Sequence, residues 1–373
     1  MKGKQGLVCM GLLLVLSSCH TGKQITASGL QRKDFQTEVN GQHTDLFTLS
    51  NKQGMEVCIT NYGARVVSIL VPDRNGKRED VVCGFSTITE YMEQRQNFGS
   101  TVGRYIGRIL NARFTLDGVE YKLVPNNGKS GHISHGGNPG FADRIWKVEQ
   151  ADTHRVRLSY LSPDGENGFP GNLKVTLVYS LGEDDNALDL TYEATTDAPT
   201  VLNLSHHSFF NISGNFTKSV EDQQLWVDAD RFTPYDDKKC VTGEYLPVAG
   251  TPLDFRMLHT IGECIDADHP QLKVVNGYDH TWELNTKGDD TRPAAWVYDP
   301  ASGRKMEIFT TEPGMQIYTG NGLKGKMTGK GGIAYPFRSA VCFETMHFQD
   351  SPNQPGFPST VLRPGEVFRS HTV

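Results

Sequence analysis

The feature that most constrains the fold is a series of short β-type segments, each followed by turn residues. Examples are LFTLSN from Leu46, RFTLDGVEYKLV from Arg113 and KMEIFTTEPGMQIYTG from Lys305. Apolar and polar residues alternate within the segments, and Gly, Asn, Asp or Pro stands between them. This spacing is typical of antiparallel strands in a sandwich or a barrel. The sequence therefore predicts an all-β fold, a large antiparallel β-sandwich with few short helices.

Local signals refine this prediction. The pair Asp117-Gly118 predicts a tight hairpin turn. Thr87 and Glu90 have the spacing of a capping box and predict a short helix, and the segment HTIGECIDA (259–267) predicts another. Neither helix is long enough for alternating βαβ units. Since 39 glycines and 18 prolines are available for turns, we expect a single β-domain over residues 33–373.

The first residues form a separate unit. Lys2 and Lys4 precede an apolar run from Leu7 to Leu16, which is followed by Ser17, Ser18 and Cys19. The run is shorter than the roughly 20 apolar residues of a membrane span, and it has the layout of a signal peptide. The sequence LSSC also resembles the bacterial lipobox, in which the cysteine becomes the lipidated first residue of the mature chain.

We therefore predict a lipoprotein signal peptide over residues 1–18, lipidation at Cys19 and a flexible tether over 19–32. This makes the protein an exported bacterial lipoprotein, periplasmic or anchored in the outer membrane. A plain secretory signal with an accidental Cys19 is the alternative.

Composition excludes some classes of function. The formal net charge is −6 and the isoelectric point is near 6.1, whereas a nucleic-acid-binding domain normally carries a basic face. Five cysteines follow the leader, an odd number without a C-x-x-C pair, which favours neither a disulfide framework nor a zinc finger. We expect them to be small buried apolar residues, and they are Cys58, Cys83, Cys240, Cys264 and Cys342.

Three segments look like ligand motifs but carry weak signals. GNGLKGK (320–326) matches G-x-G-x-x-G, yet no helix can start after it and Met327 stands where a phosphate loop needs Ser or Thr, so we predict a glycine-rich loop beside a cleft. His132 and His135 have no acidic or cysteine partner nearby, so we predict hydrogen bonding and no metal. The acidic loop GEDDN (182–186) reads as a solvated turn, with a structural calcium left open.

Two adjacent histidines stand in the strand-like run VLNLSHHSFF. Successive side chains of a strand point to opposite faces, so His206 and His207 cannot line one cleft. His207 shares its face with Asn203, Ser205 and Phe209, while His206 shares its face with apolar Leu202, Leu204 and Phe210 as well as Ser208. The polar face favours His207 as a site residue, although both histidines could be structural.

A single acid, Glu344, stands in the apolar run AVCFETMHF. Alternation places it on one face with Cys342 and Met346. A carboxylate in such company is expensive to bury unless it is paired or functional. Glu344 is therefore a second candidate, with an ordinary surface position as the alternative.

These segments resemble a known family. HHSFFNISG resembles the motif N-H-S-Y-F-N-L-x-G of the aldose 1-epimerases, the galactose mutarotases. Five further segments resemble family motifs in the same order: VGRYIGRI (G-R-x-x-N-R-I), SHGG (L-H-G-G), GTPLDFR (G-T-P-x-D-F-R), PGMQIYTGN (P-G-x-Q-x-Y-T-G-N) and VCFETMHFQDSPNQPGFP with LRPGE (C-L-E-T-Q-x-x-P-D-x-x-N-x-x-x-F-P and L-x-P-G-E). The resemblance runs from about Phe35 to the C-terminus.

The resemblance implies a galactose mutarotase-like supersandwich and a set of site residues. His207 aligns with the family's general acid and Glu344 with its general base. The residues that align with those holding the sugar hydroxyls are Arg108, His135, Asp254 and Gln316. Gly107 and His206 each replace a family Asn; the first replacement puts the sugar preference in doubt.

The activity implied is interconversion of the α and β anomers of free hexoses such as galactose and glucose, by acid/base ring opening that requires no cofactor. An isolated imidazole has a pKa near 6.5, so we expect Asp254 or Glu344 to keep His207 protonated. Aromatic candidates for stacking on the sugar are Trp226, Trp282, Phe209 and Tyr318.

We expect a small-molecule sugar as substrate, no nucleic-acid partner, and a monomer that meets a membrane only through its lipid anchor. Two alternatives stay open. One is a non-catalytic carbohydrate-binding lipoprotein on the same fold, and the other is an epimerase for a different sugar.

Overall fold

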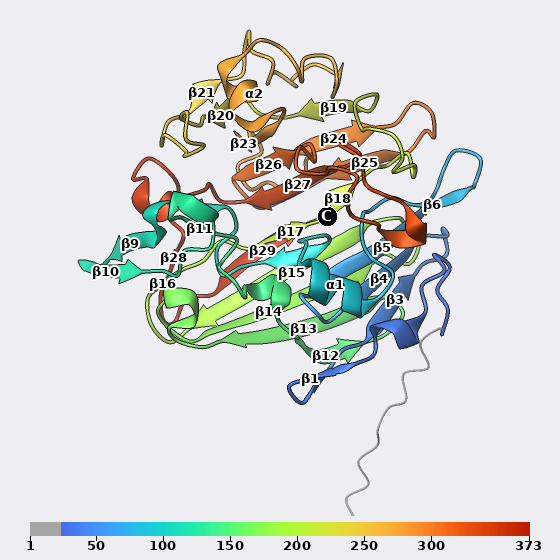
Figure 1. Ribbon diagram of the computed structural model, residues 1–373, viewed down its shortest axis with the longest axis horizontal. Coiled ribbons are helices and arrows are strands. Elements are labelled where there is room, and N and C mark those ends of the chain that lie inside the picture. The colour runs from blue at the N-terminus through green and yellow to red at the C-terminus, as the bar shows by residue number, and fades with distance from the viewer. Residues whose placement is uncertain (1–23) are drawn as a thin grey trace, which may run out of the picture.

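The structure, a computed structural model, describes residues 24–373, and its regular elements are mostly antiparallel strands joined by turns (Figure 1). The predicted signal peptide and Cys19 lie outside the described residues. Within these residues every strand pair of the sheets is antiparallel, and there are two short α-helices. The all-β prediction is confirmed.

Two sheets form the half of the molecule drawn mostly in blue and green, to which the C-terminal strand β29 adds one red strand (Figure 1). The first comprises β3 (Leu46–Ser50), β4 (Glu56–Thr60), β5 (Arg65–Pro72) and β6 (Arg78–Asp80). The second has the order β12-β13-β14-β15-β29, with β12 (Lys147–Ala151), β13 (Arg155–Ser162), β14 (Leu173–Leu181), β15 (Leu188–Thr196) and the C-terminal β29 (Phe368–Thr372).

Two further sheets form the yellow-to-red half (Figure 1). One has the order β18-β27-β26-β23-β20-β21, with β18 (Phe209–Phe210), β27 (Val341–Met346), β26 (Gly314–Tyr318), β23 (Asp279–Glu283), β20 (Arg231–Thr233) and β21 (Leu246–Pro247). The other has the order β22-β19-β24-β25, with β22 (His259–Thr260), β19 (Gln224–Val227), β24 (Ala295–Tyr298) and β25 (Lys305–Ile308).

Five two-stranded ladders complete the strands. They pair β1 (Glu38–Val39) with β2 (Gln42–His43), β7 (Ser100–Val102) with β17 (Ser205–His207), β8 (Arg108–Ile109) with β11 (Ile133–Ser134), β9 (Arg113–Leu116) with β10 (Val119–Lys122), and β16 (Thr200–Val201) with β28 (Val361–Leu362). Short 3-10 turns lie between elements: η1 (Arg32–Phe35), η2 (Leu110–Ala112), η3 (Gly128–Ser130), η4 (Phe141–Asp143), η5 (Glu166–Gly168), η6 (Lys330–Gly332) and η7 (Ser351–Asn353).

The local predictions have mixed outcomes. α1 (Ile88–Gln94) starts with the predicted capping box, in which the Thr87 hydroxyl accepts from the Glu90 amide and the Glu90 carboxylate accepts from the Thr87 amide. The hairpin of β9 and β10 turns at Asp117 and Gly118, both with positive φ. The predicted helix over 259–267 is wrong. That segment pairs with β19 as β22 and continues in turns, and the second helix, α2, lies at Pro270–Val275 instead.

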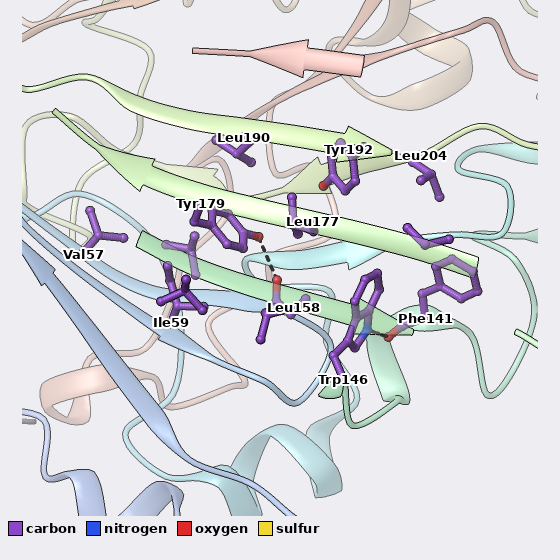
Figure 2. Close-up of a cluster of buried hydrophobic side chains, with 14 of the residues drawn as sticks. Val57, Ile59, Phe141, Trp146, Leu158, Leu177, Tyr179, Leu190, Tyr192 and Leu204 are labelled. Carbon is purple, nitrogen blue, oxygen red and sulfur yellow. Dashed lines mark hydrogen bonds between the residues drawn. The ribbon is translucent and has the colours of Figure 1, made fainter. Parts of the chain in front are cut away.

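The main core lies where the sheets of β3–β6 and of β12–β15 face each other. Alternate side chains of these strands meet there, and Figure 2 shows Val57 and Ile59 near Leu158, Leu177 and Tyr179. The Tyr179 hydroxyl donates to the carbonyl of Ala64 at 2.8 Å, so this polar group is buried with a partner. A second core fills the other half of the molecule, around Trp282, Leu225, Val297 and Ile317.

The part of the predicted tether that the structure describes differs from the expectation. Residues 24–32 pack on the folded domain, because Leu30 is buried and Arg32 pairs with Asp45. The amide of Ala27 also donates to the Glu56 carboxylate at 2.7 Å. The folded part of the chain therefore begins by residue 24, not at residue 33.

The five cysteines of the described chain are free thiols, and Cys58, Cys83 and Cys342 are buried as predicted, whereas Cys240 is half-buried and Cys264 is exposed. The loop 182–186 is largely exposed, and two of its acids, Glu183 and Asp184, pair with Lys52. Among residues 24–373, no helix has the length and apolarity needed to cross a membrane.

His371 links three segments of the fold. Its Nδ1 lies 2.7 Å from the carboxylate of Asp290 and its Nε2 lies 3.1 Å from that of Asp189, so β29 and β15 are joined to the loop that precedes β24. Burial opposes protonation of this imidazole, but hydrogen bonds to the two carboxylates outweigh burial and raise its pKa. Protonated His371 thus forms ion pairs with Asp189 in one half of the molecule and with Asp290 in the other.

The ion pairs of His371 predict that the stability of the folded protein depends on pH. A pKa that is raised in the folded state adds stability that is fully present below the unfolded pKa of about 6.5 and is lost as the pH rises through the folded pKa. We expect His371→Asn to lower the thermal midpoint more at about pH 6 than at about pH 8.5. Scanning calorimetry tests this, with the exposed His43→Asn as control; an equal effect of His371→Asn at both values would contradict it.

Candidate active site

A cavity of about 240 Å³ opens where β17, β23, β26 and β27 meet the turns next to β8 and β11. Most of its wall is polar or charged. The lining residues are Gln96, Asn97, Gly107, Arg108, Ser134, His135, His207, Phe209, Asp279, Gln316, Tyr318, Glu344, Met346 and Gln349. The cavity thus contains five of the six residues that the sequence marked as catalytic or sugar-binding.

The paired histidines separate as strand alternation predicts. His207 at the end of β17 and Phe209 at the start of β18 line the cavity, with their rings stacked at a centroid distance of 5.1 Å. His206 points to the other side, where it borders a second cavity together with Phe210 and shares a 2.6 Å hydrogen bond with the Ser208 hydroxyl. His206 therefore takes no part in the wall that holds His207.

Glu344 is brought to His207 by strand pairing. β27 pairs with β26, so that Glu344 lies opposite Gln316, and β17 runs beside β27. The Nε2 atom of His207 lies 3.3 Å from Oε1 of Glu344, and the two side chains are only 7 % and 5 % exposed. An imidazole and a carboxyl, 137 positions apart in the sequence, thus form a buried proton-sharing pair.

Burial controls the charge of this pair. Burial and the neighbouring His135 lower the pKa of His207 well below 6.5, and burial together with Asp279 raises the pKa of Glu344 well above 4.5. Both shifts favour the uncharged forms. Burial therefore favours neutral His207 and protonated Glu344, which differs from the expectation that a neighbouring carboxylate keeps His207 positively charged.

Cys342 contacts the ring nitrogen of His207 that faces away from Glu344. Its Sγ lies 3.6 Å from Nδ1 of His207, and burial raises the pKa of the thiol, so it stays protonated. Donor atoms of His207, Cys342 and Glu344 lie within 4.8 Å of one another, a set that suits a soft divalent metal ion. A metal bound there would use the lone pairs through which the pair exchanges its proton, so we interpret the cluster as a proton-transfer site.

Arg108 and His135 reach the cavity through one ladder. β8 pairs with β11, Ser134 lies opposite Arg108, and the amide of His135 donates to the carbonyl of Gly107 at 2.9 Å. Burial, reinforced by the charge of Arg108, lowers the pKa of His135 to about 4. His135 is therefore a neutral hydrogen-bonding group 5.5 Å from the ring of His207. His132 lies outside the lining, where its two nitrogens meet the Asn111 amide and the Cys240 thiol.

Asp254 is the predicted site residue that the structure places elsewhere. Its carboxylate forms a two-point ion pair with Arg256, with one contact at 2.8 Å, beside β19 and away from the cavity lining. The acid that lines the cavity besides Glu344 is Asp279, the first residue of β23. Gln316 Nε2 donates to its Oδ1 at 2.7 Å, while burial raises the pKa of Asp279.

Sequence reasoning missed Asp279 because a polar residue at the start of a strand is usually exposed. The available signal was alternation, which places Asp279 on one face with Thr281, and Thr281 lies opposite Gln316 in β26. Of the aromatic candidates, Phe209 and Tyr318 line the cavity, Trp282 is fully buried in the second core, and Trp226 stacks on Trp296 away from the cavity.

Comparison with known proteins gives a consistent result. The family model described as "Aldose 1-epimerase" matches residues 45–373. The chain is 39% identical to galactose mutarotase of Sus scrofa over 326 residues, which cover 87% of this chain and 92% of that protein. It is 36% identical to aldose 1-epimerase of Escherichia coli K12 over 335 residues, covering 89% and 95%.

Solved structures agree in fold. The GalM/aldose epimerase homologue from C. elegans superposes with a TM-score of 0.81 at 30% identity, covering 88% of this chain and 97% of that one. Galactose 1-epimerase from Lactobacillus acidophilus superposes with a TM-score of 0.78 at 28% identity, covering 90% and 95%.

Proposed function

The chain belongs to the aldose 1-epimerase family and is an isomerase, and we propose that it interconverts the α and β anomers of free hexoses such as galactose and glucose. The observation that carries this proposal is the buried pair of His207 and Glu344 in a polar, sugar-sized cavity. Acid/base ring opening requires one proton donor and one proton acceptor, each able to exchange roles. A pair that shares one proton supplies both.

The proton balance of the reaction fits this pair. We propose that the C1 hydroxyl of the bound sugar donates to Glu344, which stabilises the carboxylate and moves the shared proton across 3.3 Å to Nε2 of His207. In ring opening the C1–O5 bond breaks, Glu344 takes the proton of the C1 hydroxyl, and His207 gives its proton to O5. Rotation about C1–C2 then exposes the other carbonyl face.

Ring closure runs the same transfers in reverse. Glu344 returns its proton to the carbonyl oxygen while His207 removes the proton from the O5 hydroxyl. The pair is then again a carboxylate and an imidazolium, as it was just before ring opening. Both forms of the pair have the same net charge, so no charge enters or leaves the cavity during the cycle. The side chains of this chain carry every proton transfer, and the mechanism requires no cofactor.

Hydroxyl binding and ring stacking follow from the remaining lining. We propose that Arg108, His135, Gln316 and Asp279 hold the sugar hydroxyls and that Phe209 and Tyr318 pack against its C–H faces. A non-catalytic binder would not need a buried acid and base within 3.3 Å, which favours the enzyme. We also propose that the protein acts as a monomer.

We also propose that the mature protein is an exported lipoprotein anchored through Cys19, in the periplasm or at the outer membrane. The support is the sequence alone, with two lysines, the apolar run and LSSC. The free sugars available there would be products of polysaccharide breakdown outside the cytoplasm.

Substitutions of the pair test the reaction. General acid or base catalysis contributes roughly 10²–10⁴-fold to a rate, so we expect Glu344→Gln and His207→Asn each to lower kcat at least about a hundredfold. The measurement is polarimetry of freshly dissolved α-galactose and α-glucose, corrected for spontaneous mutarotation.

The matched control is Asp254→Asn, which alters an acid of the family-like motif whose carboxylate pairs with Arg256 outside the cavity. We expect its kcat/KM to stay within about twofold of the unaltered protein, as is usual for surface positions. Near-normal mutarotation in Glu344→Gln or His207→Asn would refute the assignment of the pair.

The pKa of His207 predicts the pH profile. Because burial lowers this pKa well below 6.5 in the free protein, kcat/KM should not titrate near pH 6.5, and the acid limb should begin at a lower pH, where the pair takes up a second proton. Polarimetric measurement of kcat/KM from about pH 5 to 8 tests this prediction. The control is a measurement showing that the protein stays folded over the same pH range. A midpoint of kcat/KM near pH 6.5 in the folded protein would contradict the prediction.

Cys19→Ala tests the anchor. We expect the full chain, expressed in a bacterial host with a lipoprotein pathway, to partition into the detergent phase, and Cys19→Ala to partition into the aqueous phase. Cys264→Ala, which removes an exposed thiol of the folded domain, is the control. Identical partitioning of all three proteins would exclude lipidation at Cys19.

A further inference from the structure

Gln349 contributes a side-chain amide to the cavity wall. The family resemblance assigns this residue no role, and the proton transfers of His207 and Glu344 do not involve it. It lies three residues after β27, is 4 % exposed and lines the cavity. Its Nε2 donates to the Tyr235 hydroxyl at 2.7 Å and, more weakly, to Oε1 of Gln316 at 3.4 Å. Its own Oε1 accepts no hydrogen bond from the described residues.

The backbone on both sides of Gln349 is fixed. The carbonyl of Phe348 accepts from the Tyr105 hydroxyl at 3.0 Å, and the amide of Asp350 donates to the carbonyl of Arg108 at 2.8 Å. The Asp350 carboxylate in turn accepts from the amide of Leu110 at 2.9 Å. The amide group of Gln349 is therefore pre-positioned against the wall that carries Arg108.

Gly107 provides the space that Gln349 occupies. A Cβ atom at position 107 would lie 2.5 Å from Cγ of Gln349, closer than two carbon atoms can approach, and the φ of Gly107 is +74°. A side chain at 107 and the present position of Gln349 therefore exclude each other. The replacement of the family Asn by Gly107 is thus coupled to a residue on a different segment.

We propose that Gln349 is a specificity-determining residue whose Oε1 accepts a hydrogen bond from one ring hydroxyl of the hexose other than the reacting C1 hydroxyl. The proposal rests on the proposed function. The hydroxyl is recognised because an acceptor oxygen in the cavity wall that loses its donor is left unpaired, so a sugar lacking that hydroxyl is bound less well.

The test is a cycle of enzyme variants and deoxy sugars. Gln349→Met keeps the size of the side chain and removes the strong acceptor, and we expect it to raise KM for the parent hexose roughly three- to tenfold with little change in kcat, as for loss of one neutral hydrogen bond. In a panel of 2-, 3-, 4- and 6-deoxy derivatives, one sugar should have the same KM in the unaltered protein and in Gln349→Met. This sugar is the one that lacks the hydroxyl bound by Gln349.

The outcomes separate the two levels of the proposal. If the unaltered protein turns over the parent hexose but Gln349→Met shifts KM by the same factor for every deoxy sugar, Gln349 does not contact a hydroxyl and the inference fails alone. If the unaltered protein accelerates mutarotation of no hexose, the proposed function itself fails.

Alanine substitutions at Gly107 and Gly118 test whether a side chain at position 107 displaces Gln349. Gly107→Ala should reproduce the altered deoxy-sugar pattern because the new Cβ displaces Gln349. Gly118→Ala introduces the same backbone strain, with φ of +80°, but its Cβ meets no atom within 4 Å. We expect Gly118→Ala to lower stability and leave the sugar pattern unchanged; an identical pattern in both alanine variants would overturn the coupling of Gly107 to Gln349.

Discussion

The contact between the imidazole of His207 and the carboxyl of Glu344 is the interaction on which the site depends. Two ionisable groups that are almost fully removed from water are stable only if they are paired or uncharged. Here both conditions hold, since the atoms lie 3.3 Å apart and burial shifts each pKa toward the neutral form. Because burial makes a permanent ion pair unfavourable, the carboxylate and imidazolium that ring opening requires have to be stabilised by the bound sugar.

The sheets supply this geometry by using both faces of the same strands. In β17, His207 lines the cavity while His206 packs on the opposite side, and in β27 the same division separates Glu344 from Phe343 and Thr345. The side chains on the opposite face border a second cavity and the two cores, so the position of the pair is fixed by packing on the far side. Strand pairing, rather than a flexible loop, sets the distance between acid and base.

Much of this arrangement could be predicted from the sequence. Alternation alone separated His206 from His207 and placed Glu344 with Cys342, because the period of a strand is a local property. It could not give Asp279 or Gln349, whose roles depend on which strands become neighbours: β23 beside β26, and the segment after β27 beside β8. Motif resemblance failed at Asp254 for a related reason, since an acid in a conserved-looking turn can serve a surface ion pair with Arg256.

The protonation state of His207 in the free protein tests the central claim most directly. The nitrogen chemical shifts of ¹⁵N-labelled histidine, assigned to His207 by comparison with His207→Asn, report whether each ring nitrogen carries a proton. We predict a neutral ring at about pH 6.5, with one protonated and one bare nitrogen, because burial lowers the pKa of this imidazole. A fully protonated imidazolium at that pH would contradict it and would mean that the pair is held as an ion pair before the sugar arrives.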